Sequence, residues 1–531
     1  MSGKRRKPGP GASAAGFPWS GLAEKHGGKI LTGVLALYAV LSLLLFDPKP
    51  FVGGDNAAYA ALSESLVQGK GLTEIWSPEQ RPHTQYPFGF PLMLAPFALL
   101  KLPYAWYKLA PWLAGLAGIL LSWLLLKKHG ALTALAACLF LAMNPHYLEF
   151  GHWVLSELPF LALMLLSLWL LARWEETGWW PWFLAAVLAA AASIHVRSAG
   201  MALLAAIPLH LVLRGKIRWA AIFLAGGAAL MVPWSLRNAH YGTSGGYLEQ
   251  FLMLDPYQPE LGRAGLGELV SRVGLNLKLY LTSVWPQLVF PSMSGRGPGG
   301  AWFLWLALLT GPVFLGAVSG VRHGWAGGWL LLGYLALSVL WPVAWTDRRF
   351  ALPLLPFLLF FLFHGYRALL SIVFRQAWRY AAAVVLALLA IANIVPVLAQ
   401  LGPNMKMQSE YRRGDRLAGY DPQWRSFFQA AGWVKSNTPG DAIVVSRKPQ
   451  LFHLASGRSS YCYPFTVDQD SVHRALKNAD YVMVEPVSGT AQRYLIPAVQ
   501  PQIDRLYRVV HAAGNPPTYV LQVIKEGTHG E

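Results

Sequence analysis

Apolar residues gather along most of the chain in long runs that are separated by short polar segments. A helix that crosses a bilayer needs roughly 17 to 25 mostly apolar residues, and eleven runs approach or reach this length. They lie near residues 30–46, 104–126, 131–147, 157–173, 180–196, 198–213, 217–236, 301–320, 326–345, 350–367 and 379–400. The pattern predicts an all-α polytopic membrane protein with about eleven transmembrane helices, in which the two runs on either side of His195 also fit one re-entrant hairpin.

From about residue 401 the pattern changes to short strands and a helix. The segments AIVVS, YVMVEP, RLYRVVHAAG and TYVLQVIKE are rich in β-branched and aromatic residues, and QDSVHRALKNA has helical spacing. These segments predict a small C-terminal α/β domain over 401–531. Its sequence has no glycine-rich phosphate loop, metal-ligand spacing or nucleophile elbow. An accessory domain that caps or orients the adjacent face is therefore favoured over a second active site.

Basic residues mark alternate ends of the predicted spans. The formal net charge is +18, but the positive residues form short clusters between apolar runs rather than one exposed face, which argues against a nucleic-acid partner. The clusters occupy 4–7, 127–128, 214–218, 322–323 and 367–379. The positive-inside rule makes these loops cytoplasmic. The remaining loops and the C-terminal domain then lie outside a plasma (inner) membrane.

These assignments divide the chain into three parts. Residues 1–29 form a basic cytoplasmic tail without an evident cleavable signal. Residues 30–400 form the membrane domain, whose external loop 47–103 is the candidate catalytic segment. Residues 401–531 form the extracytoplasmic accessory domain.

A motif in the external loop is the most specific feature of the chain. Asp55 follows two glycines, Tyr59 follows it, a Gly-x-Gly break comes at Gly69 and Gly71, and the loop ends in the aromatic-proline sequence YPFGFP from Tyr86 to Pro91. This motif resembles that of the polytopic C-type glycosyltransferases that take a sugar from a polyprenyl-phosphate carrier, such as the protein O-mannosyltransferases and the lipid A aminoarabinose transferase. The family usually has a second acidic residue directly after the first, where this chain has Asn56.

Two carboxylates are the candidate catalytic residues. The resemblance implies that Asp55 is the general base, and the Ser-acid-x-Pro sequence at Glu157 resembles the family's second acidic motif. Both residues also have a structural interpretation, because an acidic side chain caps or complements a helix N-terminus. Asn56 is an equally good cap, and the residues after Asp55 predict a short amphipathic helix in the membrane interface.

The candidate substrate-binding residues are aromatic or basic. Arginine suits a phosphate because its planar fork bonds two oxygens at once, although a basic residue at the end of a span also reaches headgroups without any specific role. Arg348 and Arg349 are the best candidates, since the family often has an arginine before its late helix. The full set is Tyr59, His83, Tyr86, Arg197, Arg237, Arg348 and Arg349.

The resemblance implies transfer of a sugar from a polyprenyl-phosphate-linked donor to an extracytoplasmic lipid, glycan or protein, with inversion. One base is sufficient, because phosphate leaves as a stable anion. No cofactor is certain, and a divalent cation is left open. The alternative is a membrane transporter or flippase for a lipid-linked or anionic substrate, but transporters place ionisable groups near the bilayer midplane, often in repeated halves. Here the spans are nearly free of charge and the halves do not match. A third interpretation, an inert membrane scaffold, has no need for Asp55.

Overall fold

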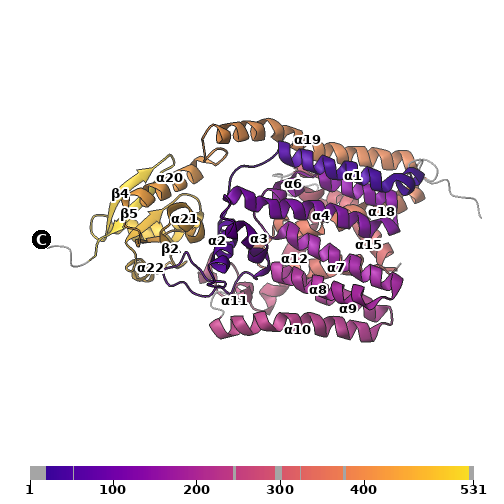
Figure 1. Cartoon of the computed structure of the whole chain (residues 1–531), viewed down its shortest axis with the longest axis horizontal. Helices are drawn as coiled ribbons and strands as arrows, with labels where there is room; N and C mark the ends of the chain where they lie inside the picture. The colour runs from indigo at the N-terminus through magenta and orange to yellow at the C-terminus, as the bar shows by residue number, and fades with distance from the viewer. Residues whose placement is uncertain are drawn as a thin grey trace, which may run out of the picture.

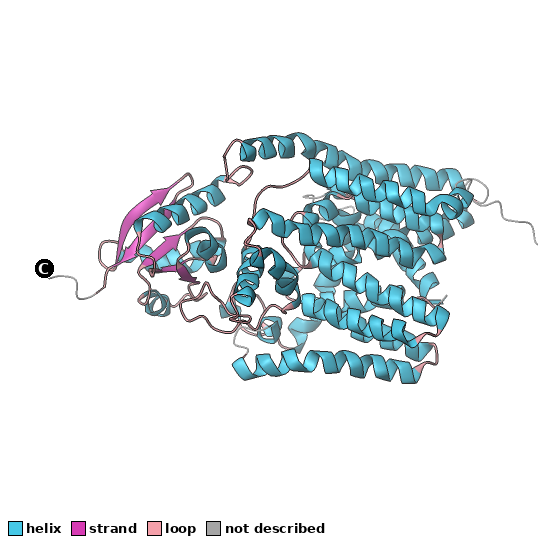
Figure 2. Ribbon diagram, in the orientation of Figure 1, coloured by secondary structure: helices cyan, strands magenta, loops and turns pink. Residues whose placement is uncertain are grey.

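The chain folds into a bundle of helices with a small mixed sheet at one end (Figure 1). This computed structural model describes residues 20–51, 53–242, 247–293, 302–322, 324–374 and 378–525. Most of the predicted cytoplasmic tail 1–29 and parts of the basic loops at 322–323 and 367–379 lie outside these ranges. In the described part, the strands are confined to the C-terminal domain (Figure 2).

Within the described residues, six helices are long and apolar enough to cross a membrane, and a seventh span is present if the bent pair α5–α6 is counted as one. The six spans lie in or include α1 (Ser20–Leu44), α4 (Leu109–Leu126), α7 (Glu157–Thr177), α10 (Ile217–Tyr241), α18 (Leu355–Val373) and α19 (Trp378–Arg412). The bent pair is α5 (Ala131–Met143) and α6 (Pro145–Gly151), which meet at 62°. Shorter apolar helices are α3 (Gly89–Leu99), α8 (Trp180–Val196), α9 (Met201–Leu213), α15 (Gly311–Arg322) and α16 (Ala326–Val339). The polytopic helical fold is confirmed, and the count of eleven spans stays a prediction.

The segment between α10 and α15 contains further helices. The sequence did not indicate α11 (Tyr247–Leu252), α12 (Leu266–Leu279) and α13 (Trp285–Val289), whereas α14 (Trp302–Trp305) lies within the predicted run 301–320. A very short helix, α17 (Arg348–Ala351), precedes α18 and begins at the side chain of Asp347, which accepts a hydrogen bond from the Arg348 backbone N–H.

The external loop folds into α2 (Gly54–Val67), followed by irregular chain and α3. The helix after Asp55 was predicted correctly, but its environment was not. Nine of its fourteen residues are buried, on all sides of the helix, because it packs against α3 on one side and the C-terminal domain on another. An amphipathic helix lying on the membrane interface is therefore the wrong description.

The C-terminal domain has a five-stranded mixed sheet with strand order β2-β1-β3-β5-β4. The strands are β1 (Ile443–Val445), β2 (Ser459–Tyr461), β3 (Tyr481–Val484), β4 (Tyr507–Ala513) and β5 (Thr518–Val523). Strands β2, β1 and β3 are parallel, and β3, β5 and β4 pair antiparallel. Helices α20 (Pro422–Asn437), α21 (Pro449–Ser456), α22 (Gln469–Leu476) and α23 (Ile496–Val499) complete it. The predicted α/β class and four of the five strands are confirmed.

The two parts of the chain meet at the external loop (Figure 1). Helix α21 packs against α2, and the Ser460 backbone N–H donates to the Trp76 carbonyl oxygen at 2.6 Å. On the other side, Asn404 near the end of α19 donates to the Leu45 carbonyl oxygen at 2.7 Å, where α1 has just ended. The loop is thus enclosed between the helix bundle and the sheet.

Candidate functional site

The candidate site is built on the external loop, where glycines permit close turns. Gly69 and Gly71 end α2 with φ angles of 73° and 65°, in the left-handed region that favours glycine. Gly89 begins α3 directly against the end of α8, since an added Cβ would lie 2.6 Å from the His195 carbonyl oxygen. The Gly-x-Gly break and the YPFGFP turn therefore fold the loop back onto the bundle beside Arg197.

Asp55 lies in the first turn of α2, but it does not cap that helix with its side chain. One carboxylate oxygen accepts a hydrogen bond from the Tyr86 hydroxyl at 2.9 Å, and the other accepts one from Arg349 Nη1 at 2.7 Å. Burial raises the pKa of the Asp55 carboxyl, but the charge of Arg349 and the hydrogen bonds from Arg349 and Tyr86 outweigh it and hold this pKa below its usual range. The Asp55 side chain is 37% exposed, so a substrate can reach it.

Glu157 is the first residue of α7 and its side chain is fully buried. Its Oε1 accepts hydrogen bonds from Arg197 Nη1 at 2.9 Å and from Arg349 Nε. Its Oε2 is buried without a hydrogen-bond partner among the described residues. Ser156 does not cap α7 with its hydroxyl, which bonds Arg197 and Tyr59 instead. Burying a carboxylate is tolerable only with such counter-charges.

Arg349 joins the two carboxylates, which come from segments far apart in the sequence. Its Nη1 bonds Asp55 and its Nε bonds Glu157, and its side chain is 24% exposed. Arg197 is 11% exposed and stacks its guanidinium over the Phe350 ring at 5.3 Å. Two of the predicted arginines therefore meet both predicted acidic residues in one network.

Aromatic side chains form one wall of this network. The Tyr59 hydroxyl lies 3.3 Å from Ser156 Oγ, and the Tyr59 ring packs 5.0 Å from the Tyr86 ring and 4.8 Å from the Phe90 ring. Tyr59 and Tyr86 thus both touch groups of the network, and their predicted contact with the substrate stays a prediction.

Three other predicted residues lie differently. His83 is buried, and its ring nitrogens contact Glu74 at 2.8 Å and the Tyr86 backbone N–H at 2.9 Å. Arg237 donates to the carbonyl oxygens of His83 and Leu72 at 2.8 and 3.0 Å. Both side chains hold the loop near Tyr86, and their contact with a substrate stays a prediction. The Arg348 side chain makes no hydrogen bond or ion pair within the described part of the chain.

Two further residues complete the description. Asn56, which stands where the family usually has a second acid, is buried and donates to the Val154 carbonyl oxygen at 3.2 Å. Lys448, in the C-terminal domain, lies beside α2, since a Cβ added to Gly54 would be 3.9 Å from its Nζ. No sequence pattern points to Lys448 beyond its place after a strand, because a local pattern does not show how a separate domain docks.

The donor set does not fit a divalent cation. Among the described residues no group of three or more His, Cys, Asp and Glu side chains comes together. The positive charge between Asp55 and Glu157 is the guanidinium of Arg349, and Glu157 is fully buried.

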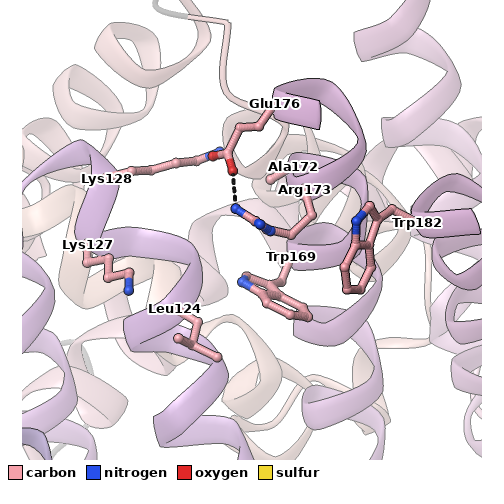
Figure 3. Close-up of a pocket in the computed structure, with 8 residues that line it drawn as sticks. All are labelled: Leu124, Lys127, Lys128, Trp169, Ala172, Arg173, Glu176 and Trp182. Atoms are coloured by element: carbon pink, nitrogen blue, oxygen red, sulfur yellow. Dashed lines mark hydrogen bonds and ion pairs between the residues drawn. The ribbon is translucent and has the colours of Figure 1, made fainter. Parts of the chain in front are cut away.

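A cavity of about 320 Å³ lies at the other end of α7 (Figure 3). Its lining includes Lys127 and Lys128 after α4 and Arg173 and Glu176 near the end of α7. Glu157 begins the same helix, and Arg173 is sixteen residues further on, about 24 Å at 1.5 Å per residue. This cavity is therefore separate from the candidate site.

Comparison with known proteins identifies solved structures that share the fold of this chain. No protein-family model and no curated protein sequence matches the chain. Among solved structures, ArnT from Cupriavidus metallidurans in the apo state matches with a TM-score of 0.59 at 14% identity, covering 95% of this chain and 100% of that chain. The same protein bound to undecaprenyl phosphate gives 0.57 at 14% identity, with the same coverage. The archaeal oligosaccharyltransferase AglB from Archaeoglobus fulgidus, in complex with an inhibitory peptide and a dolichol-phosphate, gives 0.53 at 13% identity, covering 86% of this chain and 69% of that chain. The chain therefore shares the fold of these two solved proteins, ArnT and AglB.

Proposed function

We propose that this chain is an integral membrane glycosyltransferase that moves a sugar from a polyprenyl-phosphate-linked donor to an extracytoplasmic acceptor. The observation that carries the proposal is the contact of Arg349 with both Asp55 and Glu157. It brings a reachable carboxylate and a fixed cation together at the end of the bundle where the C-terminal domain docks. The fold shared with ArnT and AglB supports the same reaction class.

Asp55 is the general base. The acceptor hydroxyl oxygen attacks the anomeric carbon, a new C–O bond forms, and the bond to the phosphate oxygen breaks with its electron pair leaving on the phosphate. The hydroxyl proton passes to Asp55. The lowered pKa keeps this carboxylate ionised at neutral pH, and the proton moves late, once bond formation has made the hydroxyl acidic. Attack on the face opposite the phosphate inverts the anomeric centre.

The arginines stabilise the negative charge that develops on the departing phosphate. A preorganised cation in a partly dry site is worth more than the same cation in water, and Arg349 is held in place by two carboxylates. The Glu157 side chain is fully buried, and among the described residues its carboxylate accepts hydrogen bonds from Arg197 and Arg349. We therefore assign Glu157 to positioning Arg349 and Arg197 rather than to contact with the acceptor.

The site faces the extracytoplasmic side of a plasma (inner) membrane in this proposal. The basic pairs Lys127–Lys128 and Arg214–Lys216 follow α4 and α9 at the end of the bundle away from Asp55. The positive-inside rule places that end in the cytoplasm. A donor held by its lipid tail then presents its phosphate to the loop from within the bilayer.

The test is transfer from a panel of polyprenyl-phosphate-linked sugars in membranes that contain the protein, with products identified by mass spectrometry. Asp55→Asn is nearly isosteric, and we expect it to lower the transfer rate by about 10²–10⁴-fold because the base is lost. Asp441→Asn, at an exposed position of the C-terminal domain, is the matched control. Movement of lipid-linked sugars across the membrane without any transfer would favour the transporter interpretation, and full activity of Asp55→Asn would contradict the mechanism.

A further inference from the structure

The C-terminal domain places a lysine beside the candidate base. Lys448 lies in the turn between β1 and α21. A Cβ added to Gly54, the residue before Asp55, would lie 3.5 Å from Lys448 Cδ and 3.9 Å from its Nζ. Burial and the neighbouring Arg447 lower the pKa of the Lys448 ammonium, while the charge of Asp55 raises it. The ammonium therefore belongs to the surroundings of Asp55 although it comes from another domain.

The turn that contains Lys448 is held in place by hydrogen bonds to the buried carboxyl group of Glu485. Glu485 Oε1 accepts hydrogen bonds from the Arg447 backbone N–H at 2.6 Å and from the Ser446 hydroxyl at 3.3 Å. Ser446 Oγ in turn accepts the Lys448 backbone N–H at 3.3 Å. This turn follows β1 and Glu485 follows β3, so both lie at the carboxyl ends of adjacent parallel strands. Open α/β sheets bind ligands at the carboxyl ends of two adjacent strands between which the strand order reverses.

Lys448 differs from Arg349, Arg197 and Arg447 because its side chain has no hydrogen-bond or ion-pair partner among the described residues. Arg349 and Arg197 are paired with Glu157, and Arg447 donates to Thr490 at 2.9 Å. Within the described ranges, the Lys448 ammonium makes no hydrogen bond and no ion pair within 4 Å. It is half-buried. A partly buried ammonium without a partner is poorly solvated and gains most from an incoming anion.

We propose that Lys448 binds the phosphate group of the polyprenyl-phosphate donor, so that the C-terminal domain supplies part of the donor site. This inference rests on the proposed function. The phosphate is the one anion that every donor must bring to Asp55, whereas an acceptor needs only a hydroxyl. Lys448 brings to the surroundings of that carboxylate an ammonium that is unpaired among the described residues, and the docking of α21 on α2 holds it there.

The test is equilibrium binding of undecaprenyl phosphate and dolichyl phosphate to the full-length protein in detergent, with the uncharged polyprenols as reference ligands. Lys448→Met should raise the Kd for the phosphates about tenfold or more, equivalent to about 1.4 kcal/mol. Lys448→Arg keeps the charge and should change the Kd less than threefold. Lys477→Met, at an exposed lysine of the same domain, should bind as the wild type does. Binding of the polyprenols should be equal in all four proteins.

The outcomes separate the two proposals. A wild-type protein that binds polyprenyl phosphate no better than polyprenol contradicts the proposed function itself. Wild-type affinity in Lys448→Met, with normal binding by the controls, overturns only the role of Lys448. An increased KM for the acceptor without a change in phosphate affinity would place Lys448 on the acceptor and would also overturn the inference. Equal melting temperatures of the variants show that the fold is intact.

Discussion

Two adjacent arginines have different surroundings in the folded protein. In TDRRF the sequence offers Arg348 and Arg349 as equal candidates, but successive residues of a helix point about 100° apart, so only one side chain reaches a given site. Arg349 contacts Asp55 and Glu157, whereas the Arg348 side chain is not paired within the described residues.

We expect Arg349→Lys to lower kcat/KM for transfer by about 10²-fold or more, because a lysine keeps the charge but not the fork that holds both carboxylates. Arg348→Lys is the matched neighbour and should remain within a few-fold of the wild type. The measurement is the transfer rate of purified variants per folded protein. Equal loss in both variants would mean that the network seen here does not decide activity.

The motif residues Asp55 and Tyr86 could be placed together from the sequence because loop spacing and turn chemistry are local. The contacts of His83 and Arg237 within the loop could not be predicted from the sequence. An arginine can bond either backbone carbonyl oxygens or a substrate, and the residue type does not distinguish the two. Only the folded loop shows that Arg237 bonds the carbonyl oxygens of His83 and Leu72.

At the scale of elements, hydropathy located helices well, because each predicted run coincides with a helix. Hydropathy did not predict elements whose length or burial depends on contacts with residues far away in the sequence. β2 has three residues, SSY, with no alternation to detect. The predicted boundary near 401 falls inside α19, which continues to Arg412 because a helix does not end where its apolar residues end.

Glu485, at the end of β3, gives an element-scale prediction. Burial raises its pKa to about 7, although hydrogen bonds from Arg447 and Ser446 act in the other direction. An unfolded glutamate titrates near 4.3, so the folded protein holds an extra proton between these values. The stability contributed by this proton is complete below about pH 4.3 and is lost as the pH rises through about 7. The total loss is roughly 4 kcal/mol.

We expect Glu485→Gln to weaken this pH dependence, because an amide keeps the acceptor oxygen and cannot ionise. The measurement is the melting temperature of full-length wild type and variant between pH 5 and 8. The wild type should lose more stability than the variant as the pH rises. Asp504→Asn, at an exposed position of the same domain, is a control with an unchanged profile. Parallel curves for wild type and Glu485→Gln would contradict the prediction.

At the scale of the whole molecule, the orientation in the membrane is the main prediction. Single cysteines at the exposed positions Glu79, Lys477 and Lys127 are introduced in a Cys462→Ser background, which leaves the buried Cys138. An impermeant thiol reagent added outside intact cells should label the first two and not Lys127→Cys. The reverse labelling pattern would mean that the orientation in the membrane is inverted. The candidate site would then face the cytoplasm, which contradicts the proposed extracytoplasmic transfer.

The external loop is tied to the C-terminal domain on both sides of Asp55, and this has a mechanical consequence. Before Asp55, the Phe51 carbonyl oxygen accepts the Tyr420 hydroxyl, and Lys49 donates to the Gly419 carbonyl oxygen at 3.3 Å. After Asp55, Trp76 is tied to β2. The carboxylate therefore sits at the joint between two bodies, and any tilt of the sheet against the bundle displaces it from Arg349. The alignment of Asp55 with Arg349 therefore depends on the angle between the C-terminal domain and the helix bundle.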